Sequence, residues 1–196
     1  MNWLARLIVE SAEKEYSRLT KSFFMTWGFL LFEAIVPGIL LLVALVVEMA
    51  LGLDRLASVK VEIGIRLGVF LLMLAAGQGF IIWTAAHQLR FSGGTPAFKA
   101  PPKKLLVDGP FRYCRNPMVF GYLLYYYGLA FLFASPVDLL ILCPALHLLA
   151  LYVIVEVEEV ELEERFGADY LTYKAKVNRM IPLPPAWRHQ LRDQGV

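Results

Sequence analysis

The chain is poor in charged residues and in cysteine, and each shortage excludes a class of protein. Only 18% of its 196 residues are charged and 58% are hydrophobic, whereas soluble domains carry about 25% charged and about 45–50% apolar residues. Two cysteines and three scattered histidines supply neither a disulfide framework nor a cluster of metal ligands. A net charge of +2 is too small to indicate a nucleic-acid partner. Together with a mean hydropathy of +0.57, this composition predicts an integral membrane protein.

Several apolar stretches reach or approach the length of about 20 residues that a helix needs to cross a bilayer. They cover residues 22–50, 63–89, 118–134 and 139–155. Pro37 interrupts the first stretch and predicts a kink there, because proline lacks a backbone donor. Ser135-Pro136-Val137-Asp138 separates the last two stretches and is typical of a helix start. We therefore predict an all-α polytopic membrane protein with about four transmembrane helices, of which the last two form a helical hairpin over residues 118–155.

Residues 1–20 precede these stretches and mix acidic with basic residues, which a secretory leader does not do. Their apolar residues recur at helical spacing: Trp3, Leu4, Leu7, Ile8, Ala12, Tyr16 and Leu19. This pattern predicts an N-terminal amphipathic helix that lies on the membrane surface.

Basic residues gather in three segments, at residues 6–21, 90–115 and 165–192, and the hairpin turn has none. With four spans, all three segments fall on one side of the membrane, which the positive-inside rule makes cytoplasmic. We predict that both termini lie on this side. The chain then divides into residues 1–92, with the amphipathic helix and the first two spans, and residues 93–196, with a cap loop, the hairpin, a glutamate-rich helix and the tail.

Two stretches are candidates for chemistry. Residues 93–118 are rich in glycine and proline and contain Asn116-Pro117, where asparagine at the N-cap and proline at the first position predict a helix start. Such a start offers free backbone N–H groups to an anion. Glutamate dominates residues 156–164, and Glu158 and Glu159 follow the apolar residues closely, so a bound ammonium or sulfonium group would stabilise one of them. The alternatives are a loop that contacts lipid headgroups and a solvated helix face.

Polar residues within the spans have two interpretations each. Glu33 either pairs with Arg66 or Gln78 in a structural role or marks a functional site, as intramembrane acids often do. The tyrosines at 122 and 125–127 form either an aromatic belt or the wall of a lipophilic pocket.

The cap loop and the glutamate-rich helix resemble the isoprenylcysteine carboxyl methyltransferase and phospholipid methyltransferase superfamily of integral membrane enzymes. The resemblance rests on Gly109-Pro110-Phe111-Arg112-Tyr113-Cys114-Arg115-Asn116-Pro117-Met118, on the stretch from Glu158-Glu159 to Tyr173, and on Arg179-Met180-Ile181-Pro182. It covers about residues 93–183. Gly94-Thr95-Pro96-Ala97 and Pro101-Pro102 resemble prokaryotic members, which implies a prokaryotic inner or plasma membrane.

The resemblance implies a membrane methyltransferase that uses S-adenosylmethionine and methylates a lipophilic acceptor, such as an isoprenylcysteine carboxylate or a phospholipid amine. Membrane lipids are its implied partners, and no metal or nucleic acid is implied. By position, the cofactor contacts are Lys103, Lys104, Leu105, Leu106, Phe111, Asn116, Pro117, Met118, Val119 and Glu158. The residues assigned to catalysis are Arg115, which supports the loop, and Glu159, which is one of two alternatives, with water, for taking the proton of an amine acceptor. Residues expected to contact the acceptor are Tyr122, Tyr125, Tyr126 and Ile154.

The sequence departs from the family pattern at several of these positions. Phe111 and Val119 replace tyrosines, and Asn116 replaces the commoner histidine. Ile154 stands where the eukaryotic carboxyl methyltransferases carry a substrate-binding arginine, which argues against a prenylcysteine carboxylate and favours an acceptor recognised by its hydrocarbon part. Two other functions stay open: a membrane reductase related to sterol reductases, which uses a reduced nicotinamide, and a non-enzymatic membrane protein.

Overall fold

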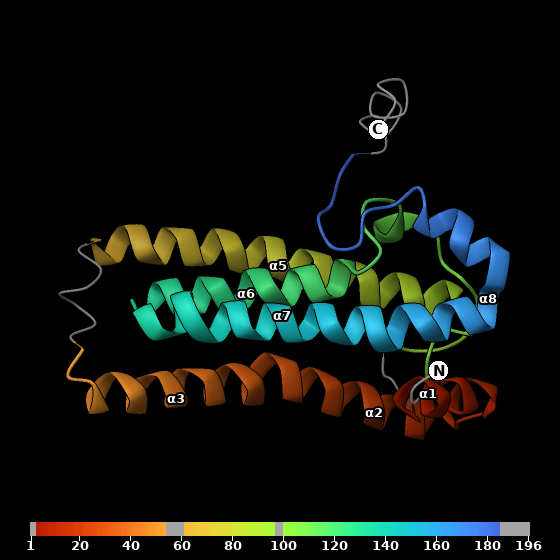
Figure 1. Ribbon diagram of the computed structural model, residues 1–196, viewed down its shortest axis with the longest axis horizontal. Helices are drawn as coiled ribbons and strands as arrows, with labels where there is room; N and C mark the ends of the chain where they lie inside the picture. The colour runs from red at the N-terminus through yellow and green to blue at the C-terminus, as the bar shows by residue number, and fades with distance from the viewer. Residues whose placement is uncertain (1–2, 54–60, 97–99, 185–196) are drawn as a thin grey trace.

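The computed structural model describes residues 3–53, 61–96 and 100–184, and every regular element in these ranges is helical (Figure 1). This confirms the all-α class. The elements are α1 (Trp3–Glu13), α2 (Arg18–Leu30), η1 (Leu31–Ile35), α3 (Val36–Ala50), α5 (Ile63–Phe91), η2 (Gly109–Arg112), α6 (Pro117–Leu132), η3 (Asp138–Leu142), α7 (Cys143–Val153), η4 (Ile154–Glu158) and α8 (Glu159–Lys174). Of these, η2 is a 3-10 turn, and η1, η3 and η4 are π-helical turns within longer helices.

Within the described residues, three helical segments are long and apolar enough to cross a membrane: Arg18–Ala50, Ile63–Phe91 and Asp138–Lys174. The apolar helix α6 is shorter, with 16 residues, so the count of four spans stays a prediction. At about 1.5 Å per residue, the part of the last helix before its kink at Gly167, residues 138–166, is about 43 Å long, whereas the hydrocarbon core of a bilayer is about 30 Å thick. The glutamate-rich end of this helix, from Glu156 onward, therefore lies beyond the membrane-spanning part.

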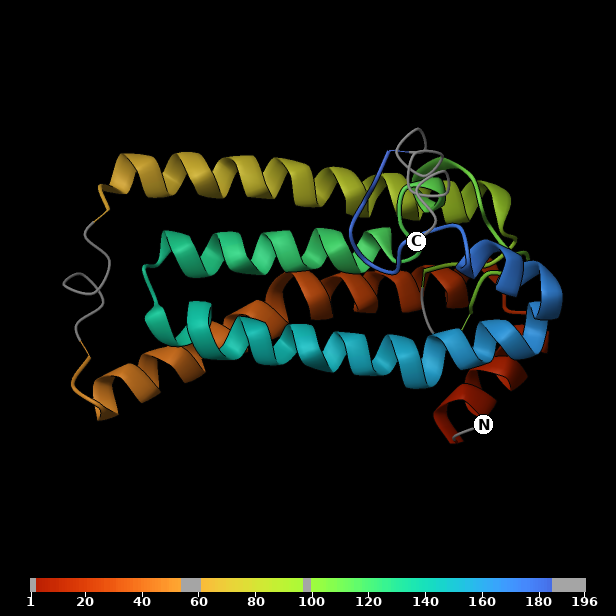
Figure 2. The same ribbon diagram turned by 45° about the horizontal axis from the view of Figure 1, so that its top comes forward.

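The long helices lie lengthwise beside one another, so the molecule has two distinct ends (Figures 1 and 2). The turn between α6 and η3 and the start of α5 lie at one end, which we call the hairpin end. Helix α1, the loop that precedes α6, and helix α8 lie at the other, which we call the cap end. The basic segments around α1, the loop and α8 thus share one end of the bundle, as their predicted common side of the membrane requires.

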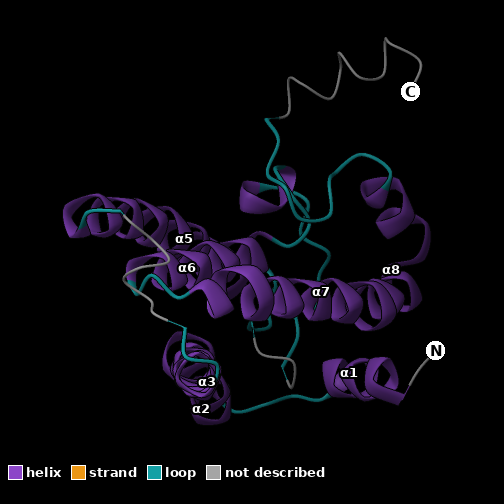
Figure 3. Cartoon of the chain, turned by 60° about the vertical axis from the view of Figure 1, so that its left-hand side comes forward, coloured by secondary structure: helices purple, strands orange, loops and turns teal. Residues whose placement is uncertain are grey.

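The surface helix and the first span are separate elements, with boundaries that differ from those predicted. Helix α1 ends at Glu13 rather than near residue 20, and α2 begins at Arg18 rather than at Ser22. The reason is a local cap: the Ser17 hydroxyl oxygen accepts a hydrogen bond from the backbone N–H of Thr20 at 3.2 Å, which starts a new helix. Helix α1 runs across the direction of the long helices, since it is seen almost end-on in Figure 1 and lengthwise in Figure 3.

The irregularity predicted at Pro37 takes the form of the π-helical turn η1. Val36 donates its N–H to the carbonyl of Leu31, five residues back, and Pro37 has no N–H to donate. The carbonyls of Phe32 and Glu33 are therefore short of backbone donors within their own helix.

Two tyrosines of α6 supply the missing donors. The hydroxyl of Tyr126 donates to the carbonyl of Phe32 at 2.7 Å, and that of Tyr125 donates to the carbonyl of Glu33 at 3.1 Å. The Glu33 carboxylate accepts a hydrogen bond from the Gln78 amide at 2.7 Å, which is one of the two partners predicted for it. Tyr125 and Tyr126 thus join the first long helix to α6.

Helices α5 and α6 approach each other closely at Gly77 and Gly121. A Cβ atom added to Gly77 would lie 2.6 Å from the Gly121 carbonyl oxygen, and one added to Gly121 would lie 2.6 Å from the Gly77 carbonyl oxygen. Because neither contact leaves room for a side chain, these two glycines set the spacing of the helices that carry the cap loop between them.

The hairpin turn is stabilised from outside the hairpin. The Ser135 hydroxyl oxygen accepts a hydrogen bond from the backbone N–H of Asp138 at 3.0 Å, which confirms the helix start predicted there. The Ser135 hydroxyl donates to the Glu48 carboxylate at 2.6 Å, and the backbone N–H of Val137 donates to the same oxygen at 3.2 Å. Glu48, which is buried in α3, therefore anchors the hairpin end.

Candidate functional site

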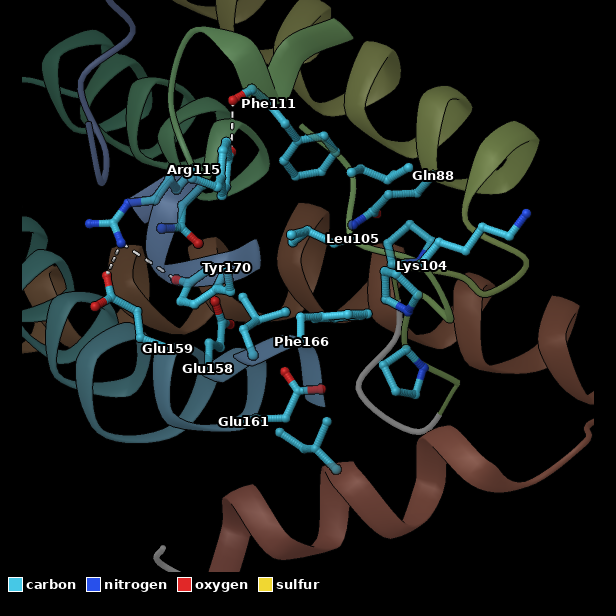
Figure 4. A pocket seen from close by; sticks show the side chains of 18 residues that line it. Gln88, Lys104, Leu105, Phe111, Arg115, Glu158, Glu159, Glu161, Phe166 and Tyr170 are labelled. Atoms are coloured by element: carbon cyan, nitrogen blue, oxygen red, sulfur yellow. Dashed lines mark hydrogen bonds and ion pairs between the residues drawn. The ribbon is translucent and has the colours of Figure 1, made fainter. Parts of the chain in front are cut away.

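A pocket of about 170 Å³ lies at the cap end, where the loop before α6 meets α8 (Figure 4). Its walls come from α1, the end of α5, the described part of the loop, η4 and α8. The apolar part of the lining includes Ile8, Pro101, Leu105, Phe111, Phe166 and Tyr173, and the polar part includes Gln88, Lys104, Arg115, Asn116, Glu158, Glu159, Glu161 and Tyr170. The site is thus built from segments that lie far apart in the sequence.

Many of the implied cofactor contacts meet at this pocket. Lys104, Leu105, Leu106, Phe111, Asn116 and Glu158 line it, as do Arg115 and Glu159, which were assigned to catalysis. Lys103 points elsewhere and lies 3.8 Å from Glu15. Pro117, Met118 and Val119 are directed into the bundle, where Pro117 is buried and the other two pack against hydrophobic clusters.

The residues expected to contact the acceptor lie deeper in the bundle and outside the lining of this pocket. Tyr125 and Tyr126 are bonded to η1, as described above, and the ring of Tyr122 lies 5.2 Å from that of Phe32. Ile154 is buried beside Leu123 and Met180. All four therefore have packing or hydrogen-bonding roles within the helical bundle, and their role toward an acceptor stays a prediction.

The loop is held over α8 by specific contacts. The guanidinium group of Arg165 donates to the carbonyl of Pro102 and is paired with Glu161 one turn earlier in α8. The Tyr173 hydroxyl donates to the carbonyl of Phe111 at 2.7 Å. These bonds hold both the proline-rich part of the loop and its η2 turn at the pocket.

The start of α6 is joined to the tail that follows α8. The backbone N–H of Asn116 and its side-chain amide both donate to the carbonyl of Arg179, at 3.1 and 2.9 Å. Asn116 occupies the N-cap position and Pro117 begins the helix as predicted, but the Asn116 side chain makes no capping hydrogen bond. The predicted position of the helix start is therefore correct, but the predicted side-chain cap is wrong. The Asn116 amide instead donates to the tail, which is distant in sequence.

Helix α8 reverses direction at Gly167, whose φ of +49° is readily accessible only to glycine. The chain beyond it returns over the pocket, where Tyr170, Tyr173 and Val177 are buried against Leu105 and other apolar side chains. This cluster covers one side of the pocket.

Glu159 is the centre of an ion-pair network. One carboxylate oxygen lies 3.1 Å from Arg115 and 2.7 Å from Arg179, and the other lies 2.8 Å from Lys174. Burial by itself would raise the pKa of Glu159, but hydrogen bonds from Arg179 and Lys174 and the charge of Arg115 hold that pKa below its usual value. Glu159 is therefore ionised and fully engaged, and it ties the loop, α8 and the tail together.

Glu158, its neighbour in sequence, is in the opposite situation. It lines the pocket (Figure 4), and it makes no hydrogen bond or ion pair with any residue that the structure describes. Burial, followed by the negative charges of Glu161 and Glu159, raises the pKa of Glu158 to about 7. A positively charged group in the pocket would relieve both effects.

Arg115 adds a donor to the same pocket. Its side chain is only 8% exposed, and its Nε–H has no partner within the described part of the chain. The pocket therefore combines an acceptor suited to a cation with a donor suited to an anion, between apolar and aromatic walls.

Residues 66–169, just over half of the chain, match the model of a family described as phospholipid methyltransferase. The chain belongs to the phospholipid methyltransferase family. It is therefore a methyltransferase, and with its long apolar helices it is an integral membrane protein. No curated protein matches the chain.

The family match includes the loop, the hairpin and most of α8, and it confirms the resemblance found in the sequence. It excludes α1 and the tail, which nonetheless reach the site through Ile8 and Arg179. Sequence reasoning missed Ile8 and Gln88 as pocket residues, because they lie outside the motifs that carry the resemblance. The amphipathic pattern of residues 1–20 identified the helix but not the surface on which it packs.

Proposed function

We propose that this family member transfers a methyl group from S-adenosylmethionine to a lipophilic acceptor, and that the pocket at the cap end holds the methyl donor. The observation that carries the proposal is Glu158, a carboxylate in a largely apolar pocket with no partner among the described residues. A strongly shifted pKa at such a place is typical of a functional site.

The lining of the pocket fits the chemical groups of this donor. Glu158 would hold the ammonium group, because a charge-assisted hydrogen bond would compensate its half-buried carboxylate. The carboxylate of the methyl donor is suited to the Nε–H of Arg115, a buried donor without a partner among the described residues. The aromatic rings of Phe111 and Phe166 offer apolar surface to a purine.

When bound, S-adenosylmethionine supplies a methyl group that its sulfonium charge makes reactive. The protein's residues orient the reactants, which contributes up to about 7–11 kcal/mol in well-aligned systems, and exclude water by means of the cluster around Tyr170. Glu159 keeps Arg115 in position. Because its pKa is lowered, Glu159 is a weak base, and an amine acceptor passes its proton to water.

The acceptor is recognised mainly by its hydrocarbon part. Ile154 lies one turn before Glu158 and contributes no charge, and it is buried against Leu123 and Met180. Each methylene buried contributes about 0.8 kcal/mol, so acceptors with longer chains should show a lower KM until the apolar surface is filled. Wild type and Ile154→Arg should be compared on a prenylcysteine and on an amine-headgroup lipid. Efficient methylation of prenylcysteine by the wild type, lost in Ile154→Arg, would contradict this assignment.

We also propose that the cap end and both termini face the cytoplasm. The distribution of basic residues supports this orientation. Orientation is tested with single cysteines at Ser11 and at Ser58, the latter outside the described residues, and a membrane-impermeant maleimide. The cysteine at position 11 should react in inverted vesicles, and the one at position 58 in right-side-out vesicles. Labelling from the same side would contradict the arrangement of spans.

The donor is tested by ligand-dependent thermal unfolding of the purified protein. S-adenosylhomocysteine should raise the Tm, and a reduced nicotinamide should not. Stabilisation by the nicotinamide alone would replace this proposal with a reductase, and stabilisation by neither ligand would favour a non-enzymatic protein.

A further inference from the structure

Helix α1 presents apolar residues in two directions. Ala5 is fully buried and Ile8 reaches the pocket, whereas Trp3, Leu4 and Leu7 are 69%, 42% and 49% exposed. Since a helix turns about 100° per residue, Trp3 and Leu7 lie on the side opposite Ala5, and Ile8 lies at the edge that meets the pocket. The helix packs on α8 and η4 with one face and leaves the other without a protein partner in the described structure.

The position of α1 brings its exposed face to the membrane surface. Residues 14–17 separate α1 from α2, the start of the first candidate span, and such a segment reaches at most about 14 Å. Helix α1 also lies across the direction of the long helices, which is the orientation of a helix in the membrane plane (Figures 1 and 3). Tryptophan, which is the most exposed of its apolar residues, favours the boundary between lipid and water.

We propose that α1 is a lipid-seated wall of the donor pocket: Trp3, Leu4 and Leu7 enter the interfacial layer of the bilayer, and this contact holds Ile8 against the pocket. The affinity for the methyl donor then depends on the lipid surface. The identity of the donor rests on the proposed function, whereas the seating of α1 does not.

The remaining connections between the N-terminal segment and the loop are weak, which gives the lipid contact its importance. Glu15 lies 3.8 Å from Lys103 in an exposed ion pair, and Lys21 donates to the carbonyl of Gly93 at 3.3 Å. Exposed pairs of this kind contribute little to stability. Burial of apolar side chains in lipid therefore adds more to the packing of α1 on α8 and η4 than these exposed pairs do.

The seating is tested with an environment-sensitive fluorophore on cysteine, in nanodiscs. Cys114 and Cys143 are buried, so the label reports on an introduced cysteine. In Leu7→Cys the label should be quenched by lipids that carry a nitroxide near the headgroup. In the matched variant Arg6→Cys, on an exposed polar position that lies about 100° around the same helix from Leu7, it should be quenched by aqueous iodide. Equal iodide quenching at both positions, or disulfide cross-linking between two copies through residue 7, would overturn the proposal.

The coupling is tested by the affinity for S-adenosylhomocysteine. Ile8→Ala should weaken binding about three- to tenfold in both nanodiscs and detergent, because it removes apolar contact from the wall. Leu7→Ser should weaken binding by a similar factor in nanodiscs only, and Leu19→Ser, the same change at an exposed position of α2, should have no effect. Unchanged affinity in both Ile8→Ala and Leu7→Ser would overturn the coupling. If the wild type fails to bind the ligand, the proposed donor is wrong, and the quenching experiment still decides whether α1 is seated in lipid.

Discussion

Two acids, one at each end of the bundle, are held in opposite ways. At the hairpin end, Glu48 accepts hydrogen bonds from Ser135 and Val137 of another helical segment. At the cap end, Glu158 lines a pocket and has no partner within the described residues. An acid that is bonded to its own chain holds the fold together, whereas a half-buried acid that lines a pocket without a partner is suited to a ligand. Residue type and hydrophobic surroundings do not distinguish the two, but their partners do.

The contrast is tested most strongly at Glu48. Glu48→Ala should lower the free energy of unfolding by about 2–4 kcal/mol, because the Ser135 hydroxyl and the Val137 N–H lose their acceptor in a buried place. Unfolding in mixed micelles with increasing denaturing detergent measures the effect.

A matched variant sharpens this result. Glu48→Gln keeps a carbonyl oxygen as acceptor and should lose less than half as much stability. The affinity of folded Glu48→Ala for S-adenosylhomocysteine should equal that of wild type, and a large loss of affinity would mean that the hairpin end also takes part in binding.

The second prediction concerns the cap end. Glu158→Gln should weaken S-adenosylhomocysteine binding by about 1.5–3 kcal/mol, or about 10- to 150-fold in Kd, because a charged hydrogen bond to the ligand's ammonium is lost. Isothermal titration calorimetry measures the change. Glu164→Gln, an exposed glutamate on the same helix, is the matched control and should bind like wild type. Equal affinities for Glu158→Gln and wild type would remove Glu158 from the site.

The third prediction follows from the pKa of Glu158, about 7 in the free protein. The ionised carboxylate binds the ammonium, so the pKa falls when the ligand binds. At pH values below 7, Glu158 is mostly protonated and must lose its proton before it can bind the ammonium group. The Kd for S-adenosylhomocysteine should therefore rise by up to about tenfold for each unit by which the pH falls. This slope should disappear in Glu158→Gln, and a slope that persists in the variant would assign the titration to another group.

The smallest effect is expected where a hydrogen bond joins two helices within the bundle. Tyr126→Phe removes the donor to the Phe32 carbonyl and should lower stability by about 0.6 kcal/mol, the average for such bonds in membranes. The affinity for S-adenosylhomocysteine should be unchanged. A marked loss of acceptor turnover at unchanged stability would instead support Tyr126 as part of an acceptor site.

Much of the fold follows from local patterns in the sequence. Apolar runs predict the long helices, and Ser135 with the following proline predicts where the last helix begins, because these residues act through the backbone next to them. The predicted boundary between the surface helix and the first span, at residues 20–22, differs from the observed one at Ser17. The reason is that the Ser17 cap starts a new helix within one continuous apolar pattern. The site was predicted only as far as the family motifs extend, which is why Ile8 of α1 was not expected there.

Hydrophobic periodicity and motif spacing are properties of the chain alone, so they already indicate that this protein is helical, lies in a membrane and carries the motifs of a methyltransferase family. Composition leaves open which of the adjacent residues Glu158 and Glu159 takes a bound cation, and the family resemblance favours Glu158 without a physical reason, which the tertiary structure supplies. Arg115 and Arg179, from the loop and the tail, converge on Glu159 and leave Glu158 facing the pocket. Burial and ion pairing depend on residues that are distant in sequence, so the local pattern of charges does not contain this physical reason.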